Sequence, residues 1–350
     1  MTDQPTLTDG VVTLRPWRDE DIARAVAGHD EEIAHWFGRA EPPSENDWRL
    51  LVAEWRSARE QGRTVAAYVV EHAGEAVGNV EVTPEGDVGG SLSWALWAGH
   101  RGHGLATRAV RVLADWALTE SSLGGLGLRR IEARVDPSNE ASLRIATRAG
   151  LRREGIQRVE AGMGDRPDAT GYVVHARLAS DPPLTDPQSF RAMLNSFLPR
   201  KRAIAQLLVR DQADRVLLCE LTYKPDWDLP GGVVEVGESP RLASEREIAE
   251  ELGLELTVGD LLLTDWLPPW SGWDDAVCLV FDGGVHPASL IDSAVHQERE
   301  IRGAEFCTLD QVRARARDFT ARRIEAAWRR ARGDQAAPAF TESGRTDPAT

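Results

Sequence analysis

Three glutamates in the second half of the chain have a spacing that could bind a metal ion. Glu247, Glu250 and Glu251 stand at positions i, i+3 and i+4, so on a helix their carboxylates would share one face. Their charges repel one another there, and a place in the last turn costs Glu250 and Glu251 roughly 0.3 to 1 kcal/mol each through the helix dipole. Mg²⁺ or Mn²⁺ would reverse this balance, because such ions combine carboxylate and phosphate oxygens. The alternative is an acidic face open to solvent.

Local signals bracket the helix that would carry these glutamates. Ser239 suits an N-cap, Pro240 the first helical position and Gly253 a left-handed C-cap. Gly231 and Gly232 precede the helix and permit a backbone turn that other residues resist. The sequence therefore predicts a helix over 240–252 that is entered through a glycine turn.

The complete spacing around this helix resembles the Nudix box. Five residues separate the second glycine from an acidic residue, and seven more precede an Arg-Glu pair. The WDLPGG sequence at 227–232 resembles the usual lead-in to that box. The matching positions are Gly232, Glu238, Arg246, Glu247, Glu250, Glu251, Gly253 and Leu254.

This resemblance implies hydrolysis of a nucleoside diphosphate linked to another moiety. It implies that Glu247, Glu250 and Glu251 hold Mg²⁺ or Mn²⁺, which lowers the pKa of its bound water and bridges phosphoryl oxygens. The general base would be a glutamate of the box or one from a later loop, where Glu298 and Glu300 precede the final predicted strand. Residues expected to contact the substrate or orient the glutamates are Trp227, Gly231, Gly232 and Arg246.

The first half contains a glycine-punctuated turn at 99–106 between a predicted strand, 91–97, and a helix. Glycines let backbone N–H groups approach a phosphate, and the helix N-terminus favours an anion. A tight strand-to-helix turn explains the same pattern without a ligand. The next strand, 129–135, is followed by DPSNEAS at 136–142, another helix, and AGLRREG at 149–155.

This order resembles the GNAT acetyltransferases, specifically the branch that acetylates ribosomal-protein N-termini and related amines, over about residues 8–178. The resemblance implies acetyl-CoA as co-substrate and an amine or protein N-terminus as acceptor. It places Asn139 on the pantetheine arm or a bound water. The residues implied to bind the acetyl-CoA pyrophosphate are Arg101, Gly102, His103, Gly104, Leu105 and Ala106.

Acetyl transfer requires that the amine lose a proton and that the thiolate leaving group be protonated or stabilised. Ser142 is placed to act on the thiolate, and Glu81, on the strand before the glycine loop, could be the base directly or through water. An exposed strand glutamate explains Glu81 equally well. Many GNAT enzymes have a tyrosine soon after this serine, but none lies between Ser142 and Tyr172.

The length of 350 residues and the proline-containing segment 181–189 predict two domains. We expect an α/β fold throughout, with a GNAT mixed sheet flanked by helices followed by a Nudix α/β/α sandwich. The expected boundaries are 1–180 for the GNAT domain, 181–200 for a linker, 201–332 for the Nudix domain and 333–350 for a disordered tail.

Composition argues against several other functions. The formal net charge of −15 and the lack of a long basic run argue against a DNA or RNA polymer as partner. No apolar run approaches 18 residues, so we expect no membrane span. The three cysteines contain no CxxC pair, which favours reduced thiols in a cytoplasmic protein. Trp266, Trp270 and Trp273 could stack a nucleobase or pack as core or lid residues.

The two resemblances together predict a bifunctional protein, with an acetyl-CoA-dependent N-acetyltransferase followed by a Mg²⁺- or Mn²⁺-dependent hydrolase of a small nucleotide substrate. One alternative is that the GNAT half no longer transfers acetyl groups and senses acetyl-CoA to regulate the hydrolase. Another is that the Nudix half only binds a nucleotide, which its complete set of box carboxylates argues against.

Overall fold

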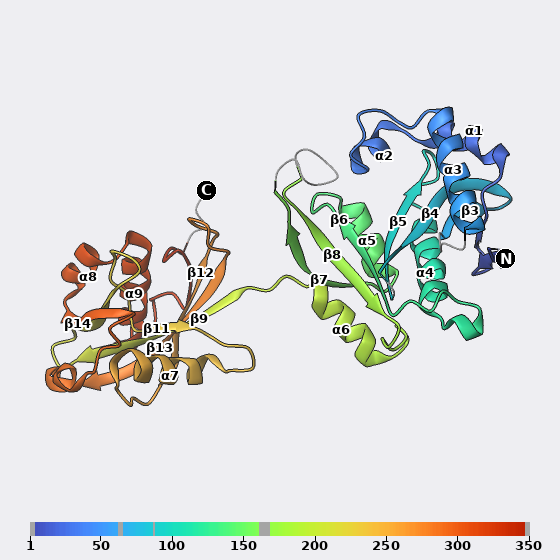
Figure 1. Ribbon diagram of the computed structural model, residues 1–350. Helices are drawn as coiled ribbons and strands as arrows, with labels where there is room; N and C mark the ends of the chain where they lie inside the picture. Colours follow the sequence, from blue (N-terminus) through green and yellow to red (C-terminus); the bar gives the residue numbers. More distant parts are fainter. Residues whose placement is uncertain (1–3, 62–65, 87, 161–168, 347–350) are drawn as a thin grey trace. The chain divides into compact units, whose positions relative to one another are not determined.

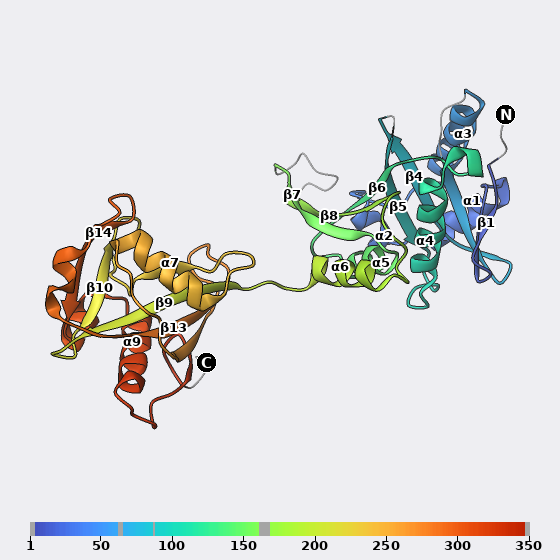
Figure 2. The same ribbon diagram turned by 90° about the horizontal axis from the view of Figure 1, so that it is seen from below.

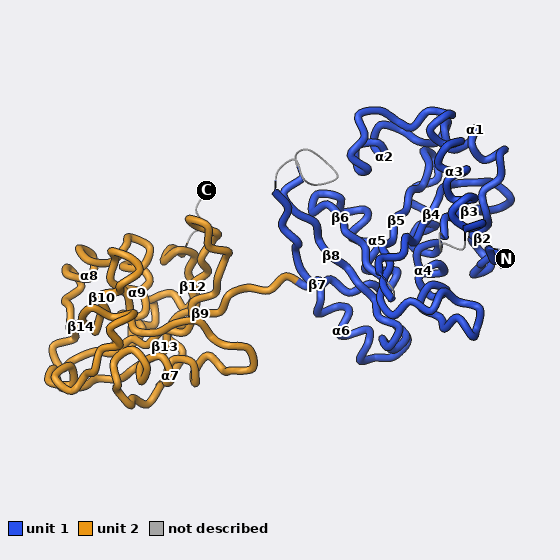
Figure 3. Tube along the Cα trace, in the orientation of Figure 1, with its two compact units in different colours: residues 1–198 blue, residues 199–350 orange. Residues whose placement is uncertain are grey.

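The computed structural model describes residues 4–61, 66–86, 88–160 and 169–346. The chain divides into two compact units, residues 1–198 and 199–350 (Figure 3). Each unit has its own sheet and its own buried core.

Unit 1 is built on an eight-stranded sheet in the order β1-β2-β3-β4-β5-β6-β8-β7 (Figure 1). The strands are β1 (Leu7–Thr8), β2 (Val12–Arg15), β3 (Ala66–His72), β4 (Glu75–Glu85), β5 (Gly89–Leu96), β6 (Arg130–Val135), β7 (Arg152–Arg158) and β8 (Gly171–Leu178). The helices are α1 (Asp19–Gly28), α2 (Glu31–Trp36), α3 (Glu45–Glu60), α4 (Leu105–Leu118), α5 (Glu140–Arg148) and α6 (Pro187–Phe197), with a short 3-10 turn η1 (Ser121–Leu123). Antiparallel pairs and one parallel pair, β5 with β6, make this the mixed sheet that the sequence predicts.

Alternating side chains bury both faces of this sheet. On β3, Tyr68 and Val70 pack into a core shared with α4 and α5, whereas Val69 packs into a second core shared with α1 and α3. In the second core Trp17 stacks on Trp48 with ring centroids 5.0 Å apart. A strand buried on both faces reads as a continuous apolar run, which is the pattern of β3.

The two parallel strands of unit 1 separate after a short pairing. Gly89–Ser91 of β5 pair with Arg130–Glu132 of β6, but β5 continues to Leu96 and β6 to Val135 without further pairing to each other. The sheet therefore opens between these strand ends, beside the N-termini of α4 and α5.

Unit 2 is a three-layer sandwich around the sheet order β14-β10-β9-β13-β12-β15, with β11 also paired to β9. Its strands are β9 (Arg202–Asp211), β10 (Val216–Leu221), β11 (Gly231–Val233), β12 (Leu261–Leu267), β13 (Ala276–His286), β14 (Ile301–Cys307) and β15 (Phe340–Glu342). Its helices are α7 (Pro240–Leu252), α8 (Leu309–Arg315) and α9 (Asp318–Ala331), with a 3-10 turn η2 (Ala288–Ser293). One buried core lies under α7 and another under α8 and α9, so these helices cover opposite faces of the sheet, as Figure 2 shows. This confirms the predicted α/β/α architecture.

The segment expected to be a linker contains a helix. Asp186 accepts a hydrogen bond from the Ser189 backbone N–H at 2.7 Å and so caps α6. Arg152 of β7 donates to the Ser189 hydroxyl at 3.1 Å, and α6 packs against β7. The prolines of 181–189 therefore lead into a capped helix of unit 1, and this unit extends to Leu198 rather than ending at the expected boundary of 180.

The expectation of disorder at 333–350 is also wrong for the described residues up to 346. Strand β15 pairs in parallel with β12. The Thr341 hydroxyl and the Gly344 backbone N–H donate to Asp265 Oδ1 at 2.7 and 2.9 Å. A polar composition predicts disorder only when no distant partner exists, and here the buried Asp265 carboxylate supplies one.

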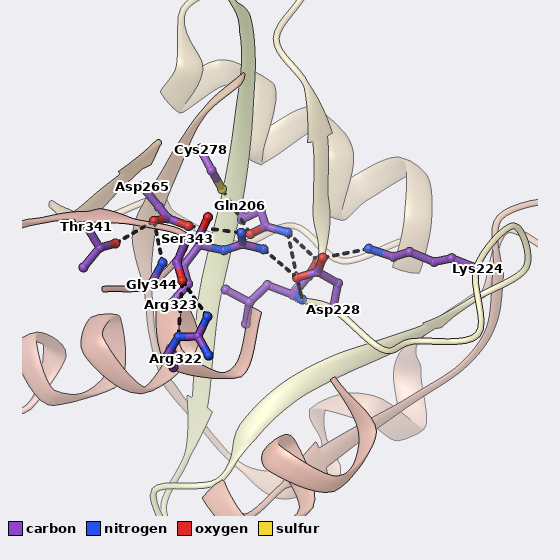
Figure 4. A network of polar contacts seen from close by, with 11 residues as sticks. Gln206, Lys224, Asp228, Asp265, Cys278, Arg322, Arg323, Thr341, Ser343 and Gly344 are labelled. Carbon is purple, nitrogen blue, oxygen red and sulfur yellow. Dashed lines mark hydrogen bonds and ion pairs between the residues drawn. The ribbon is translucent and has the colours of Figure 1, made fainter. Parts of the chain in front are cut away.

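A buried ionic network joins this C-terminal segment to the lead-in of the acidic helix (Figure 4). Arg323 of α9 lies between Asp265 at 3.4 Å and Asp228 at 3.3 Å, and all three side chains are at most 9% exposed. Asp228 also accepts hydrogen bonds from Gln206 at 3.0 Å and Lys224 at 2.8 Å. Burial alone would raise the pKa of Asp228, but the charges of Arg323 and Lys224 lower it below its usual value.

The three cysteines are buried and unpaired, which agrees with the prediction that they form no disulfide framework. In the described parts of the chain, no helix combines the length and apolar character that a bilayer crossing needs.

We predict that Arg323→Met strongly destabilises unit 2. The substitution leaves the buried Asp265 carboxylate without its cation and Asp228 with Lys224 alone, which costs about 3 to 5 kcal/mol. Denaturant unfolding followed by hydrogen exchange should show the loss in unit 2 and not in unit 1. Arg313→Met is the matched control, because Arg313 pairs with Asp310 and Glu325 on the surface and should leave the midpoint almost unchanged. Equal midpoints for both variants would contradict the importance of the network.

Candidate active sites

Helix α7 begins and ends where the sequence predicts. The Ser239 hydroxyl accepts from Leu242 N at 3.3 Å, Pro240 occupies the first turn, and Gly253 at the C-cap has a φ of 63°. The helix packs against β9 and β11, so its inner face lies beside the glycine pair.

Glu251 is seated on the backbone of that glycine pair. Its side chain is buried, with the residue 4% exposed, and it accepts a hydrogen bond from Gly231 N at 2.9 Å. Gly231 has a φ of 138°, and a Cβ there would lie 2.2 Å from the Ala205 carbonyl oxygen. Burial, together with the charges of Glu247 and Glu300, raises the pKa of Glu251 to about 8 despite the hydrogen bond from Gly231.

Glu247 lies directly against the second glycine. A Cβ on Gly232 would stand 2.5 Å from Glu247 Oε1, so a larger residue would displace the carboxylate. Burial raises the pKa of Glu247, Arg246 opposes the shift, and the charges of Glu250 and Glu300 add to it. The structure thus brings Glu247, Glu251 and Glu300 into one electrostatic cluster. Of the two later-loop glutamates, Glu300 is the one whose charge acts on the box glutamates.

Arg246 organises the outer side of this cluster. It donates to both oxygens of Glu238 at 2.9 and 3.0 Å, to Glu247 at 2.9 Å and to Glu250 at 3.0 Å. The side chain of Glu250 is 53% exposed, against 13% for Glu247. Glu250 therefore stands at the solvent edge, while Glu247 and Glu251 point at the glycine turn.

The donor chemistry fits a divalent cation only in part. Among the residues that the structure describes, no group of three His, Cys, Asp or Glu side chains is arranged as a metal site, and Arg246 occupies Glu247 and Glu250. However, Glu251 is buried, Glu247 is partly buried, and both carboxyl groups have raised pKa values because burial and the neighbouring carboxylates disfavour their charged forms. Mg²⁺ and Mn²⁺ bind carboxylate oxygens, and a bound ion would stabilise the ionised forms of these two side chains.

Trp227, expected to touch substrate, instead packs inward. Its indole lies partly buried against the core under α8 and α9. The Arg315 guanidinium sits 4.5 Å from the ring centroid. The contacts of Trp227 support the loop that leads to Gly231, so its role here is to position that loop.

The glycine turn of unit 1 forms the N-terminus of α4. Gly102 and Gly104 have φ values of 84° and 75°, and Gly104 is the N-cap. His103 is exposed, whereas Leu105 and Ala106 are buried at the start of the helix. Gly102, Gly104, Ala106, Asn139 and Ser142 all line one cavity of about 280 Å³ at the opening between β5 and β6.

Arg101 of this turn does not have a free guanidinium. It donates to the Leu96 carbonyl at 3.1 Å and pairs with Asp30 at 2.8 Å and with Glu32. Glu32 also lines the 280 Å³ cavity. An incoming phosphate would therefore have to compete with two carboxylates for Arg101.

Asn139 and Ser142 lie close together, and Tyr172, to which the sequence assigned no role, lines the same hollow. Asn139 caps α5 by accepting from Ser142 N at 3.0 Å. Both residues line a hollow of about 100 Å³ with Tyr172. Tyr172 is distant in sequence, but β8 pairs with β6, with Val173 opposite Val135, so its phenol reaches the strand opening. A search for tyrosine near Ser142 along the chain could not find it, whereas strand pairing could.

Glu81 lies in a separate cavity of about 420 Å³ between β4, β5 and the first helices. Burial raises the pKa of Glu81, and the nearby charge of Glu54 adds to this effect. Asn79 also lines the cavity, and its Oδ1 has no hydrogen-bond partner among the described residues. Ser93, opposite Glu81 in the sheet, lines both this cavity and the hollow with Ser142. Glu81, the possible base, and Ser142, which could act on the leaving thiolate, therefore line two cavities that share Ser93 of β5.

Comparison with known families assigns both units. Residues 12–152 match the family model of the acetyltransferase (GNAT) domain, and residues 199–327 match that of the NUDIX domain. The chain carries a GNAT domain followed by a NUDIX domain. Both belong to enzyme families, which confirms the two resemblances found in the sequence.

Individual relatives match either the GNAT or the NUDIX part. A probable N-acetyltransferase from Bacillus subtilis (strain 168) is 42% identical over 67 residues, which are 19% of this chain and 34% of that protein. A candidate 8-oxo-dGTP diphosphatase from Mycobacterium tuberculosis (strain ATCC 25618 / H37Rv) is 62% identical over 51 residues, which are 14% of this chain and 35% of that protein. The chain thus spans about a third of the length of these two relatives. An acetyltransferase (GNAT family) from Bacillus anthracis, a solved structure, has a TM-score of 0.42 at 20% identity and covers 50% of this chain and 99% of that one.

The position of Arg101 in the GNAT domain predicts that its two carboxylate partners oppose acetyl-CoA binding. Asp30→Asn combined with Glu32→Gln should tighten acetyl-CoA binding about two- to fivefold, because partly exposed ion pairs are worth about 0.2 to 1 kcal/mol. Asparagine at 30 keeps the cap on α2. Calorimetric titration measures the change, and Arg101→Ala in the same background should abolish it. An unchanged affinity in the double variant would mean that Arg101 does not bind the phosphates.

Proposed function

We propose that the chain is a bifunctional enzyme that joins an acetyl-CoA-dependent N-acetyltransferase to a Mg²⁺- or Mn²⁺-dependent NUDIX hydrolase of a nucleoside diphosphate-linked substrate. For the hydrolase, the supporting observation is that the buried Glu251 and the partly buried Glu247 lie against Gly231 and Gly232 and have raised pKa values. The name of the mycobacterial relative, a diphosphatase, supports a nucleotide substrate.

In the NUDIX domain, Glu247, Glu250 and Glu251 would hold the metal ion. The ion would supply an activated water and neutralise charge on the pyrophosphate. Glu300 is the candidate base, because it lies close enough to raise the pKa of both Glu247 and Glu251. Arg246 would release Glu247 and Glu250 on loading and keep its bidentate contact with Glu238.

In the GNAT domain, Gly102 to Ala106 would bind the pyrophosphate of acetyl-CoA at the N-terminus of α4, with Asn139 beside the pantetheine arm. Glu81 would take the proton from the ammonium form of the acceptor. The amine nitrogen then attacks the thioester carbonyl carbon, the carbon–sulfur bond breaks, and the nitrogen loses a second proton, which restores the group that protonates the thiolate. Tyr172 or Ser142 would give a proton to the departing thiolate, since both line the same hollow. The acceptor is an amine or a protein N-terminus.

The hydrolase proposal predicts that Glu250→Gln with Glu251→Gln abolishes metal-dependent hydrolysis and leaves acetyl-CoA binding intact. The wild-type chain should be screened with Mg²⁺ and Mn²⁺ against nucleotide sugars, ADP-ribose, dinucleotides, CoA and nucleoside triphosphates. Glu255→Gln is the control, because Glu255 is exposed and follows the helix. Hydrolysis that survives the double substitution would refute the metal assignment.

The transferase proposal predicts that acetyl transfer rises with pH through an ionisation above the ordinary carboxyl range. The raised pKa of Glu81 sets this limb, because only the deprotonated carboxylate accepts the proton. Glu81→Gln should remove the limb and lower kcat by about 10² to 10⁴, whereas Glu75→Gln, at the exposed start of the same strand, should change neither.

Amine libraries provide the acceptors for this pH–rate measurement. Acetyl-CoA binding without transfer to any amine, together with a change in hydrolysis, would instead support a sensing role for the GNAT domain.

A further inference from the structure

Two tryptophans of the NUDIX domain are exposed on a rigid hairpin. Trp270 is 49% and Trp273 is 59% exposed. Their backbones exchange two hydrogen bonds, Trp270 N to Trp273 O at 3.0 Å and Trp273 N to Trp270 O at 2.9 Å. The two residues between them, Ser271 and Gly272, both have positive φ values, 49° and 86°. This is a tight two-residue turn, and directly opposed residues of a hairpin place their side chains on one face.

An arginine holds each indole from one side. Arg317 lies 4.4 Å from the Trp270 ring centroid, and Arg202 lies 4.9 Å from that of Trp273. Phe319 meets Trp270 at its edge, 6.3 Å away. These contacts fix both rings and still leave about half of each side chain to solvent. Trp266 does not share this exposure, since it lies within β12 and pairs with Val277 and Glu342.

The arginines connect the tryptophans to the carboxylate site. Arg317 pairs with Asp226, five residues before Gly231. Arg202 is three residues before Ala205 on β9, and Ala205 pairs with Gly232, against which Glu247 rests. At about 3.3 Å per residue this places Arg202 roughly 10 Å along the strand from the glutamate, at the end of the sheet where the chain leaves β11. Arg202 shares the face of β9 with Ile204, opposite the face of Ala205 and α7, so a ligand that touches both sites passes round this end of the sheet.

We propose that Trp270 and Trp273 stack the base of the nucleoside diphosphate substrate while its phosphates reach Glu247 and Glu251. The proposal rests on the hydrolase function proposed above. Flat, rigid indoles suit a base because every base has a π-face. Arg202 beside Trp273 adds positive charge that favours an anionic ligand, whereas the charge of Arg317 is already paired with Asp226. An apolar protein partner would not need cations beneath both rings.

The test compares Trp270→Leu/Trp273→Leu with Trp270→Phe/Trp273→Phe in the full chain. With Mg²⁺ present, calorimetric titration should show that adenosine and guanosine 5′-monophosphates, which have no pyrophosphate bond to hydrolyse, bind to the wild type. Affinity should fall tenfold or more in the leucine variant and stay within about threefold in the phenylalanine variant. Ribose 5-phosphate, which has no base, should bind all of them equally. Trp328→Phe, at another arginine-stacked indole, should bind like the wild type.

A kinetic arm separates this proposal from the hydrolase proposal. With Mg²⁺ and the best substrate from the screen, the leucine variant should raise KM tenfold or more with kcat within about twofold. Base-dependent binding without any hydrolysis by the wild type would refute the hydrolase proposal and leave intact the proposal that Trp270 and Trp273 form a stacking platform for the base. Wild-type nucleotide affinity in the leucine variant, or an equal loss of ribose 5-phosphate binding, would overturn the platform.

Discussion

The close approach of two carboxylates to the backbone of Gly231 and Gly232 is the constraint on which the NUDIX domain depends. Neither glycine can carry a side chain, because a Cβ would meet the Ala205 carbonyl in one case and the Glu247 carboxylate in the other. Glu251 gains one hydrogen bond there and loses most of its water. Burial therefore raises the pKa of Glu251 to about 8, and a ligand that brings positive charge would favour its ionised form.

Two arginines of the NUDIX domain, Arg246 and Arg323, bind the other carboxylates around the glycine turn. Arg246 links Glu238 to the outer box glutamates, and Arg323 neutralises Asp228 and Asp265 inside the sandwich. Both act on the same loop from opposite faces of the sheet, because Asp228 lies three residues before Gly231. The C-terminal strand completes the inner network through Thr341. The position of the glycine turn thus depends on residues from both ends of the NUDIX domain.

In the GNAT domain the equivalent constraint is the separation of two parallel strands. Strands β5 and β6 pair at three positions and then separate. The glycine turn, Asn139 and Ser142 line one cavity at the resulting opening. The neighbouring cavity with Glu81 lies across β5 from the hollow with Ser142, and Ser93 borders both. A thioester entering from one side and an amine from the other would meet at that strand.

Local chemistry by itself determined helix α7, its caps, the glycine turns and the order of elements that indicates both families, because these depend on neighbours within a few residues. It could also indicate that Glu247 and Glu251 share a helix face. Tertiary contacts alone decided that Tyr172 lines a hollow with Ser142, that Asp30 and Glu32 bind Arg101, and that Glu300, one of the two candidates in the later loop, raises the pKa values of Glu247 and Glu251. The same holds for the C-terminal segment, whose order comes from Asp265, a partner 76 residues away from Thr341. Strand pairing and buried charge act between residues distant in sequence, so neither composition nor spacing could reveal them.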